Sequence, residues 1–159
     1  MVDSTAKNSL TQMAEDIFNL TKMSWRERIS SNSDRQDELT EAQFLTLDAI
    51  SSAGTPQNIG YLHRTIGVLP AQMSRIVRSL ERDFPKPLIQ CRLNPDDKRK
   101  IDVSLTAAGK IAHTQFRDLR LQTTLQLLGR LDEQDRTDFT RICRRLRDLY
   151  AHPSATENH

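Results

Sequence analysis

The chain has 159 residues, of which 36% are apolar and 28% charged, and its formal net charge is +2. This length suits a single domain over 1–159, and no apolar run approaches the ~20 residues needed to span a bilayer, which argues against a membrane partner. The first ten residues lack the apolar segment of a secretory signal, and the only two cysteines are Cys91 and Cys143, so we expect a cytoplasmic protein with reduced thiols.

The positive charge is concentrated in the middle of the sequence. Residues 1–57 hold 5 Lys and Arg against 9 Asp and Glu, residues 58–110 hold 10 against 5, and residues 111–159 hold 8 against 7. A basic segment within a nearly neutral chain is typical of a nucleic-acid contact rather than of a uniformly solvated surface.

Apolar residues at helical spacing predict a long amphipathic helix at 5–30. Its apolar seam consists of Leu10, Met13, Ile17 and Leu20. A loop rich in Ser, Asn and Asp follows over 30–38. Thr40 is then expected to cap a second helix, which ends at Gly54.

The next two predicted helices are short and close together. Thr55-Pro56 signals the start of one, which stops at Gly67, and Pro70 suits the first turn of the other. Two short helices joined by a three-residue turn that contains Gly form a helix-turn-helix, whose second helix enters the major groove. One side of that second helix is apolar, with Met73, Ile76, Val77 and Leu80, and the opposite side carries Ala71, Arg75, Arg78 and Arg82.

The residues after this helix alternate with period two, which predicts a β-hairpin. One side of the hairpin collects Ile89, Cys91, Leu93, Ile101, Val103 and Leu105. Turn-forming residues at 94–97 join the two strands and leave Lys98, Arg99 and Lys100 at a solvent-exposed tip. A helix-turn-helix followed by such a hairpin is a winged helix, which we place at 40–106.

Two further helices are expected between 106 and 150, separated at Gly129. In the first we expect the more buried positions to be Ile111, Phe116, Leu119, Leu125 and Leu128. The second, capped by Asp132, has a seam of Phe139, Ile142, Leu146 and Leu149. Because the helix at 5–30 has a seam of the same spacing, we expect 5–30 and 106–150 to supply dimerisation helices that pack on each other and on a second copy.

The segment NPDDKRKIDVSLTAAG resembles the wing of the MarR family of winged-helix transcriptional regulators. The residues that match the family pattern are Asp97, Arg99, Val103, Leu105, Thr106 and Gly109, and the resemblance extends from the first helix to Tyr150. It implies a mainly α fold with a small β-hairpin wing. It also implies an obligate homodimer joined by its N- and C-terminal helices, which would bind a pseudo-palindromic duplex.

The resemblance further implies which residues meet DNA. Arg99 would enter the minor groove with Asp97 orienting it, and Ala71, Gln72 and Arg75 would face the major groove. Contacts with phosphates would come from Arg78, Arg82, Lys98 and Lys100. The residue types agree, since Gln can pair with adenine and Arg can bind guanine O6 and N7.

The recognition helix departs from the family at its N-cap, the residue just before its first turn. Leu69 stands where the family usually has Ser or Thr, so this helix lacks a side-chain cap worth about 1 kcal/mol.

Other interpretations stay open at this point. The arginine row could be a solvated face, Arg99 and Asp97 could form a plain turn salt bridge, and a winged helix could serve only to bind another protein. An enzyme finds little support, because the sequence has no Gly-rich phosphate loop, nucleophile motif or paired acidic motif. The four histidines do not cluster at metal-ligand spacing, so neither a metal nor a cofactor is expected. A DNA-binding regulator would leave room for a small-molecule effector between its dimerisation and DNA-binding layers.

Overall fold

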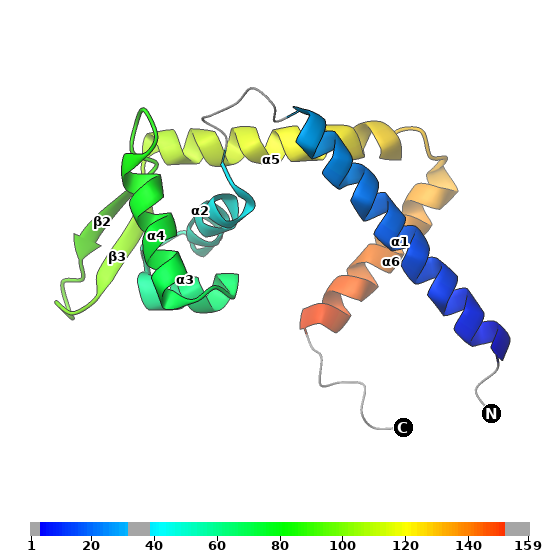
Figure 1. The fold of residues 1–159 in the computed structure, drawn as a ribbon, viewed down its shortest axis with the longest axis horizontal. Coiled ribbons are helices and arrows are strands. Elements are labelled where there is room, and N and C mark those ends of the chain that lie inside the picture. Colours follow the sequence, from blue (N-terminus) through cyan, green and yellow to red (C-terminus); the bar gives the residue numbers. More distant parts are fainter. Residues whose placement is uncertain (1–3, 32–38, 152–159) are drawn as a thin grey trace. The chain divides into compact units, whose positions relative to one another are not determined.

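A computed structural model describes residues 4–31 and 39–151 (Figure 1). In this part of the chain the elements are α1 (Ser4–Ser31), α2 (Glu41–Ala53), β1 (Gln57–Asn58), α3 (Ile59–Ile66), α4 (Pro70–Arg82), β2 (Ile89–Leu93), β3 (Ile101–Leu105), α5 (Ala107–Leu128) and α6 (Glu133–Ala151). The chain divides into two compact units, Met1–Thr40 and Glu41–His159. Most of the predicted loop at 30–38 lies outside the described residues.

The architecture confirms the predicted class, mainly α with a small β wing. Over the described ranges, no helix combines the length and the apolar character needed to cross a membrane.

The first unit contains α1, which confirms the helix predicted at 5–30. The four residues of its predicted seam, Leu10, Met13, Ile17 and Leu20, are each more than half exposed. Lys22 lies over the ring of Phe18, with its Nζ 5.0 Å from the ring centroid. This helix therefore presents an uncovered apolar stripe within the chain.

The second unit has its core where α2, α3 and α4 meet a three-stranded antiparallel sheet of order β1-β3-β2. In the hairpin, Cys91 pairs with Val103 and Ile89 pairs with Leu105. The largest fully buried apolar side chains come from every one of these layers except β1: Leu47, Leu62, Met73, Leu80, Ile89 and Val103. In Figure 1 the β2–β3 hairpin extends past the helices, as a wing does.

The predicted start of the third helix was wrong. Instead of beginning at Thr55-Pro56, α3 begins at Ile59, because the Asn58 side chain accepts a hydrogen bond from the Tyr61 backbone N–H at 2.8 Å and caps the helix. Gln57 and Asn58 are held by β3 as the short strand β1. A two-residue strand shows no periodicity, so the sequence pattern could not reveal it.

The turn between α3 and α4 is as predicted. Gly67 ends α3 with φ of 77°, in the left-handed region that glycine adopts without strain. Leu69 occupies the cap position of α4 and makes no side-chain hydrogen bond there, and Pro70 lies in the first turn. The helix-turn-helix geometry thus depends on Gly67 and on the fixed φ of Pro70.

Two residues of the wing motif, Thr106 and Gly109, make structural contacts at the start of α5. Thr106 accepts a hydrogen bond from the Gly109 backbone N–H at 3.0 Å and donates its hydroxyl to the Pro87 carbonyl at 2.6 Å. A Cβ atom at position 109 would collide with the Leu88 carbonyl group. Thr106 and Gly109 therefore join α5 to the residues that lead into β2.

Along α5 the predicted burial was largely wrong. Phe116 is buried, at 6% exposure, and Leu128 is half-buried, but Ile111, Leu119 and Leu125 are exposed. The reason is that α2 and β3 cover only one part of this helix. Asp132 caps α6 as predicted, accepting from the Asp135 backbone N–H at 2.8 Å. The predicted α6 seam of Phe139, Ile142, Leu146 and Leu149 is also exposed within the chain.

Candidate nucleic-acid interface

The outer face of α4 carries the predicted DNA-contacting residues. Ala71, Gln72, Arg75, Arg78 and Arg82 are all exposed, while the apolar residues on the other side of the helix are buried. Arg82 Nε lies 3.8 Å from a Glu81 carboxylate oxygen. Neither Arg75 nor Arg78 forms an ion pair with any residue that the structure describes, so both guanidinium groups are available to an anion.

Asn94 shapes the loop at the end of the wing. Its side-chain oxygen accepts hydrogen bonds from the backbone N–H groups of Asp96 and Asp97, both at 2.9 Å. Its side-chain amide donates to Asp102 at 2.7 Å. The sequence identified Asn94 only as a turn residue, and its bond to Asp102 on β3 depends on a hairpin register that no local pattern indicates.

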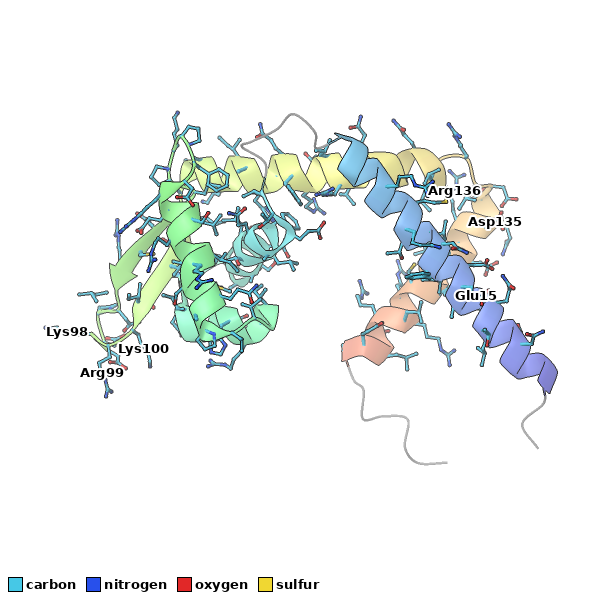
Figure 2. All side chains as sticks on the ribbon, in the orientation of Figure 1. Glu15, Lys98, Arg99, Lys100, Asp135 and Arg136 are labelled. Carbon is cyan, nitrogen blue, oxygen red and sulfur yellow. The ribbon has the colours of Figure 1, made fainter. Side chains whose placement is uncertain are left out.

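The tip itself presents Lys98, Arg99 and Lys100, all exposed, at the far end of the hairpin (Figure 2). Asp97 accepts hydrogen bonds from the Arg99 backbone N–H at 3.1 Å and from Arg99 Nε at 3.2 Å, and it lies 3.3 Å from Lys100 Nζ. These contacts, the Arg99 backbone bond above all, lower the pKa of the Asp97 carboxyl. The Arg99 side chain is 92% exposed. The pair therefore adds little stability, but it limits the directions in which the guanidinium points.

Cys91 lies on the inner side of β2 and is half-buried, which fits its predicted role as a small core residue. Burial raises the pKa of its thiol to about 11, with a further contribution from the nearby Glu81 carboxylate. The thiolate is the reactive form, so this thiol is held in its unreactive state. Cys143 is exposed on α6.

Three pairs of facing side chains join α2 to α5, and the sequence did not predict them. Glu41 lies 3.7 Å from Arg120, Phe44 stacks on Phe116 with 4.7 Å between ring centroids, and Asp48 lies 2.8 Å from His113. The Phe44 ring also stacks on the His113 ring, at 5.2 Å. Each helix contributes positions i, i+3 and i+7, which share one face. We call these six residues the α2–α5 contact.

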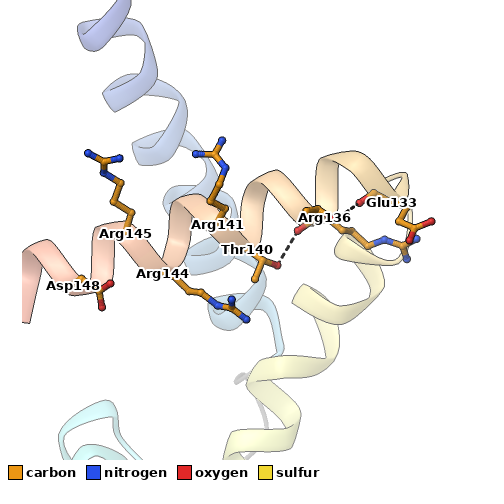
Figure 3. Close-up of a pocket in the computed structure, with 8 residues that line it drawn as sticks. Glu133, Arg136, Thr140, Arg141, Arg144, Arg145 and Asp148 are labelled. Carbon is orange, nitrogen blue, oxygen red and sulfur yellow. Dashed lines mark hydrogen bonds between the residues drawn. The ribbon is translucent and has the colours of Figure 1, made fainter.

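A hollow runs along α6 (Figure 3). It is lined by Glu133, Arg136, Thr137, Thr140, Arg141, Arg144, Arg145 and Asp148. All of these residues belong to one helix and are exposed, so the hollow is a surface depression with a basic lining rather than an enclosed ligand site. Within the described ranges, no group of three or more His, Cys, Asp and Glu side chains could hold a metal ion.

Comparison with known proteins shows a shared fold at low sequence identity. The sequence matches no protein-family model and no curated protein. The chain is similar to a MarR family protein from Bacillus stearothermophilus, with 16% identity, a TM-score of 0.73 and coverage of 95% of this chain and 99% of the other. It is also similar to Streptococcus pneumoniae FabT in complex with DNA, at 15% identity, TM-score 0.71 and coverage of 93% and 99%.

A third similar structure is the PcaV transcriptional regulator from Streptomyces coelicolor in complex with its natural ligand. It has 18% identity, a TM-score of 0.57 and coverage of 94% of this chain and 99% of the other. Together these similarities show that the chain shares the winged-helix fold of these proteins.

Proposed function

We propose that this chain, which has the MarR-type winged-helix fold, is a DNA-binding transcriptional regulator that binds a pseudo-palindromic operator as a homodimer. The observation that carries the proposal is the pairing of an exposed arginine row on α4 with an exposed Lys98-Arg99-Lys100 tip on the adjacent wing. Cations on both elements of a winged helix match the phosphate rows of a duplex. FabT, which shares the fold, has been solved with DNA bound.

In this proposal some α4 residues read the base sequence and others position the protein on the DNA backbone. Ala71, Gln72 and Arg75 lie in the first half of α4 and would face base edges in the major groove, while Arg78 and Arg82 would meet phosphates. On the wing, Arg99 would enter the minor groove in the direction that Asp97 sets, and Lys98 and Lys100 would bind the flanking phosphates.

The proposed dimer is supported by apolar surface that the chain itself leaves uncovered. The exposed seams of α1 and α6, namely Leu10, Met13, Ile17, Leu20, Phe139, Ile142, Leu146 and Leu149, exceed what single scattered surface residues explain. In the proposed organisation, 5–30 and 106–150 are the dimerisation helices, 40–106 is the DNA-binding module, and 1–159 forms one MarR-like domain. Two-fold symmetry would place half-sites about one helical turn apart, roughly 34 Å.

A small-molecule effector is part of the proposal because PcaV, which shares the fold, binds a natural ligand. We assign no catalytic activity to the chain. An operator-binding regulator acts where the chromosome lies, so we place it in the cytoplasm.

The proposal is tested by selecting bound duplexes from a random pool with the purified full chain at low salt. We expect a symmetric consensus, whose affinity falls on the order of 10³-fold or more between 50 and 200 mM salt if about six phosphates are neutralised. Arg99→Ala should weaken binding strongly, whereas Arg130→Ala, which removes an exposed cation beyond α5, should not. If no duplex is retained at low salt, the proposal fails, and the fold would then serve as a protein-interaction module.

A further inference from the structure

Two exposed apolar side chains face each other near the end of the wing. Leu93 and Ile101 are cross-strand partners in the β2–β3 register, and they are 66% and 40% exposed. By the alternation of each strand, they lie on the same side of the sheet as the buried Ile89 and Val103. The inner, apolar side of the sheet thus continues beyond the part that the helices cover.

This pair has no role in the core of the chain as described. A cross-strand apolar pair can strengthen a hairpin, but burial is what makes leucine and isoleucine favourable, and here most of the Leu93 side chain meets water. The residues on the opposite side of β2, Gln90 and Arg92, are polar, so the hairpin otherwise follows the usual pattern of one apolar and one polar side.

The surroundings of the pair indicate what would cover it. Three cations, Lys98, Arg99 and Lys100, follow directly at the tip. The described residues near the tip supply carboxylates from Asp96, Asp97 and Asp102, of which Asp97 is engaged by Arg99 and Lys100 and Asp102 by Asn94. An apolar flank beneath a basic tip complements a surface on which hydrocarbon lies beside closely spaced anions. The wall of a DNA minor groove is such a surface, because deoxyribose C–H groups line it between the phosphates.

We propose that Leu93 and Ile101 pack against the deoxyribose wall of the minor groove that Arg99 enters, and that this contact sets the depth of the wing. The inference rests on the proposed DNA-binding function and adds a contact that no cation supplies. Apolar side chains are an established means by which proteins engage the minor groove. Because the pair lies on the flank of the hairpin rather than at its tip, it meets sugars and does not separate base pairs.

The test compares a double variant, Leu93→Thr with Ile101→Thr, against the parent on the selected operator over a series of salt concentrations. Threonine is β-branched and favoured in strands, so it should leave the hairpin formed while it removes most of the apolar surface of both side chains. We expect affinity to fall about tenfold at every salt concentration with an unchanged salt slope, since no phosphate contact is lost. Gln90→Thr, on the polar side of β2, is the matched control and should bind like the parent.

A swapped variant, Leu93→Ile with Ile101→Leu, keeps the apolar surface and should restore binding to near the parent value. A double threonine variant that binds as tightly as the parent would overturn the inference, as would a changed salt slope. So would a loss of affinity accompanied by a weakened dimer in sedimentation, because the pair would then belong to a contact between protein chains. If the parent itself binds no duplex, the proposed function fails instead, and the two failures are thereby distinguished.

Discussion

His113 Nε2 on α5 lies 2.8 Å from Asp48 Oδ1 on α2, and the same imidazole stacks against Phe44. The His113 side chain is largely buried, whereas that of Asp48 is partly exposed. These residues are 65 positions apart in the sequence, and their bond ties the helix-turn-helix unit to the long helix that follows the wing. The α2–α5 contact therefore attaches the helix-turn-helix unit to α5, in addition to the contacts that Thr106 and Gly109 make at the start of that helix.

The interaction between His113 and Asp48 should be measurable as a coupling free energy in a double-mutant cycle. We expect His113→Ala to lower the free energy of unfolding by about 1–3 kcal/mol, because it removes both the hydrogen bond and the stacked ring. Asp48→Ala should cost less, since its carboxylate is partly solvated. The double variant in urea unfolding should lose less than the two single changes combined, and full additivity would show that the pair does not interact.

The restraint that Asp97 places on the Arg99 side chain can be distinguished by mutation from the effect of the Asp97 charge itself. Asp97→Ala removes a negative charge from the tip that we propose binds DNA, which alone would strengthen binding, but it also frees the Arg99 guanidinium. We expect weaker operator binding, because an unrestrained side chain loses more conformational entropy when it enters the groove.

The matched control for Asp97→Ala is Asp96→Ala, measured in the same binding assay. It makes the same charge change at the neighbouring exposed residue, whose backbone N–H, rather than its carboxylate, bonds to Asn94. This variant should bind as well as the parent or slightly better. Equal effects of the two substitutions would show that only charge matters at the tip.

Gly109 should tolerate no side chain. In Gly109→Ala the added methyl group meets the Leu88 carbonyl, so either the start of α5 or the residues entering β2 must move. We expect a loss of at least about 2 kcal/mol in unfolding free energy, although alanine favours helix by roughly 1 kcal/mol over glycine. Lys110→Ala, at the next and exposed position, is the control in thermal unfolding. A stabilised Gly109→Ala variant would contradict the close contact.

The thiol of Cys91 should resist alkylation in the folded protein. With Cys143→Ser as background, iodoacetamide at pH 8 should react much more slowly in buffer than in urea, since burial raises the folded-state pKa from 9.0 to about 11. The unfolded chain releases the proton first, so the thiol should also reduce stability progressively as pH rises from 9 to 11. Cys91→Ala should remove that part of the pH dependence. Equal labelling rates in buffer and urea would show that the thiol is accessible.

Features that depend on neighbours along the chain were largely readable from the sequence. The spacing of apolar residues in α1 and α6, the glycine after α3, the helix that starts at Thr106 and the alternation of β2 and β3 all express local patterns, and the structure has each of them. The exposed row on α4 follows for the same reason, because a 3.6-residue period places charged and apolar residues on opposite sides.

Features that depend on partners far along the chain required the folded structure. Periodicity tells which side of α5 is apolar but not how much of it another element covers, so Ile111, Leu119 and Leu125 were misplaced in the core. The strand β1 exists because β3 pairs with it, and Asn58 caps α3 just after that pairing. The bond between Asp48 and His113 likewise needs α2 and α5 side by side. Local patterns record the preferences of one segment, and only the packed chain decides which segments meet.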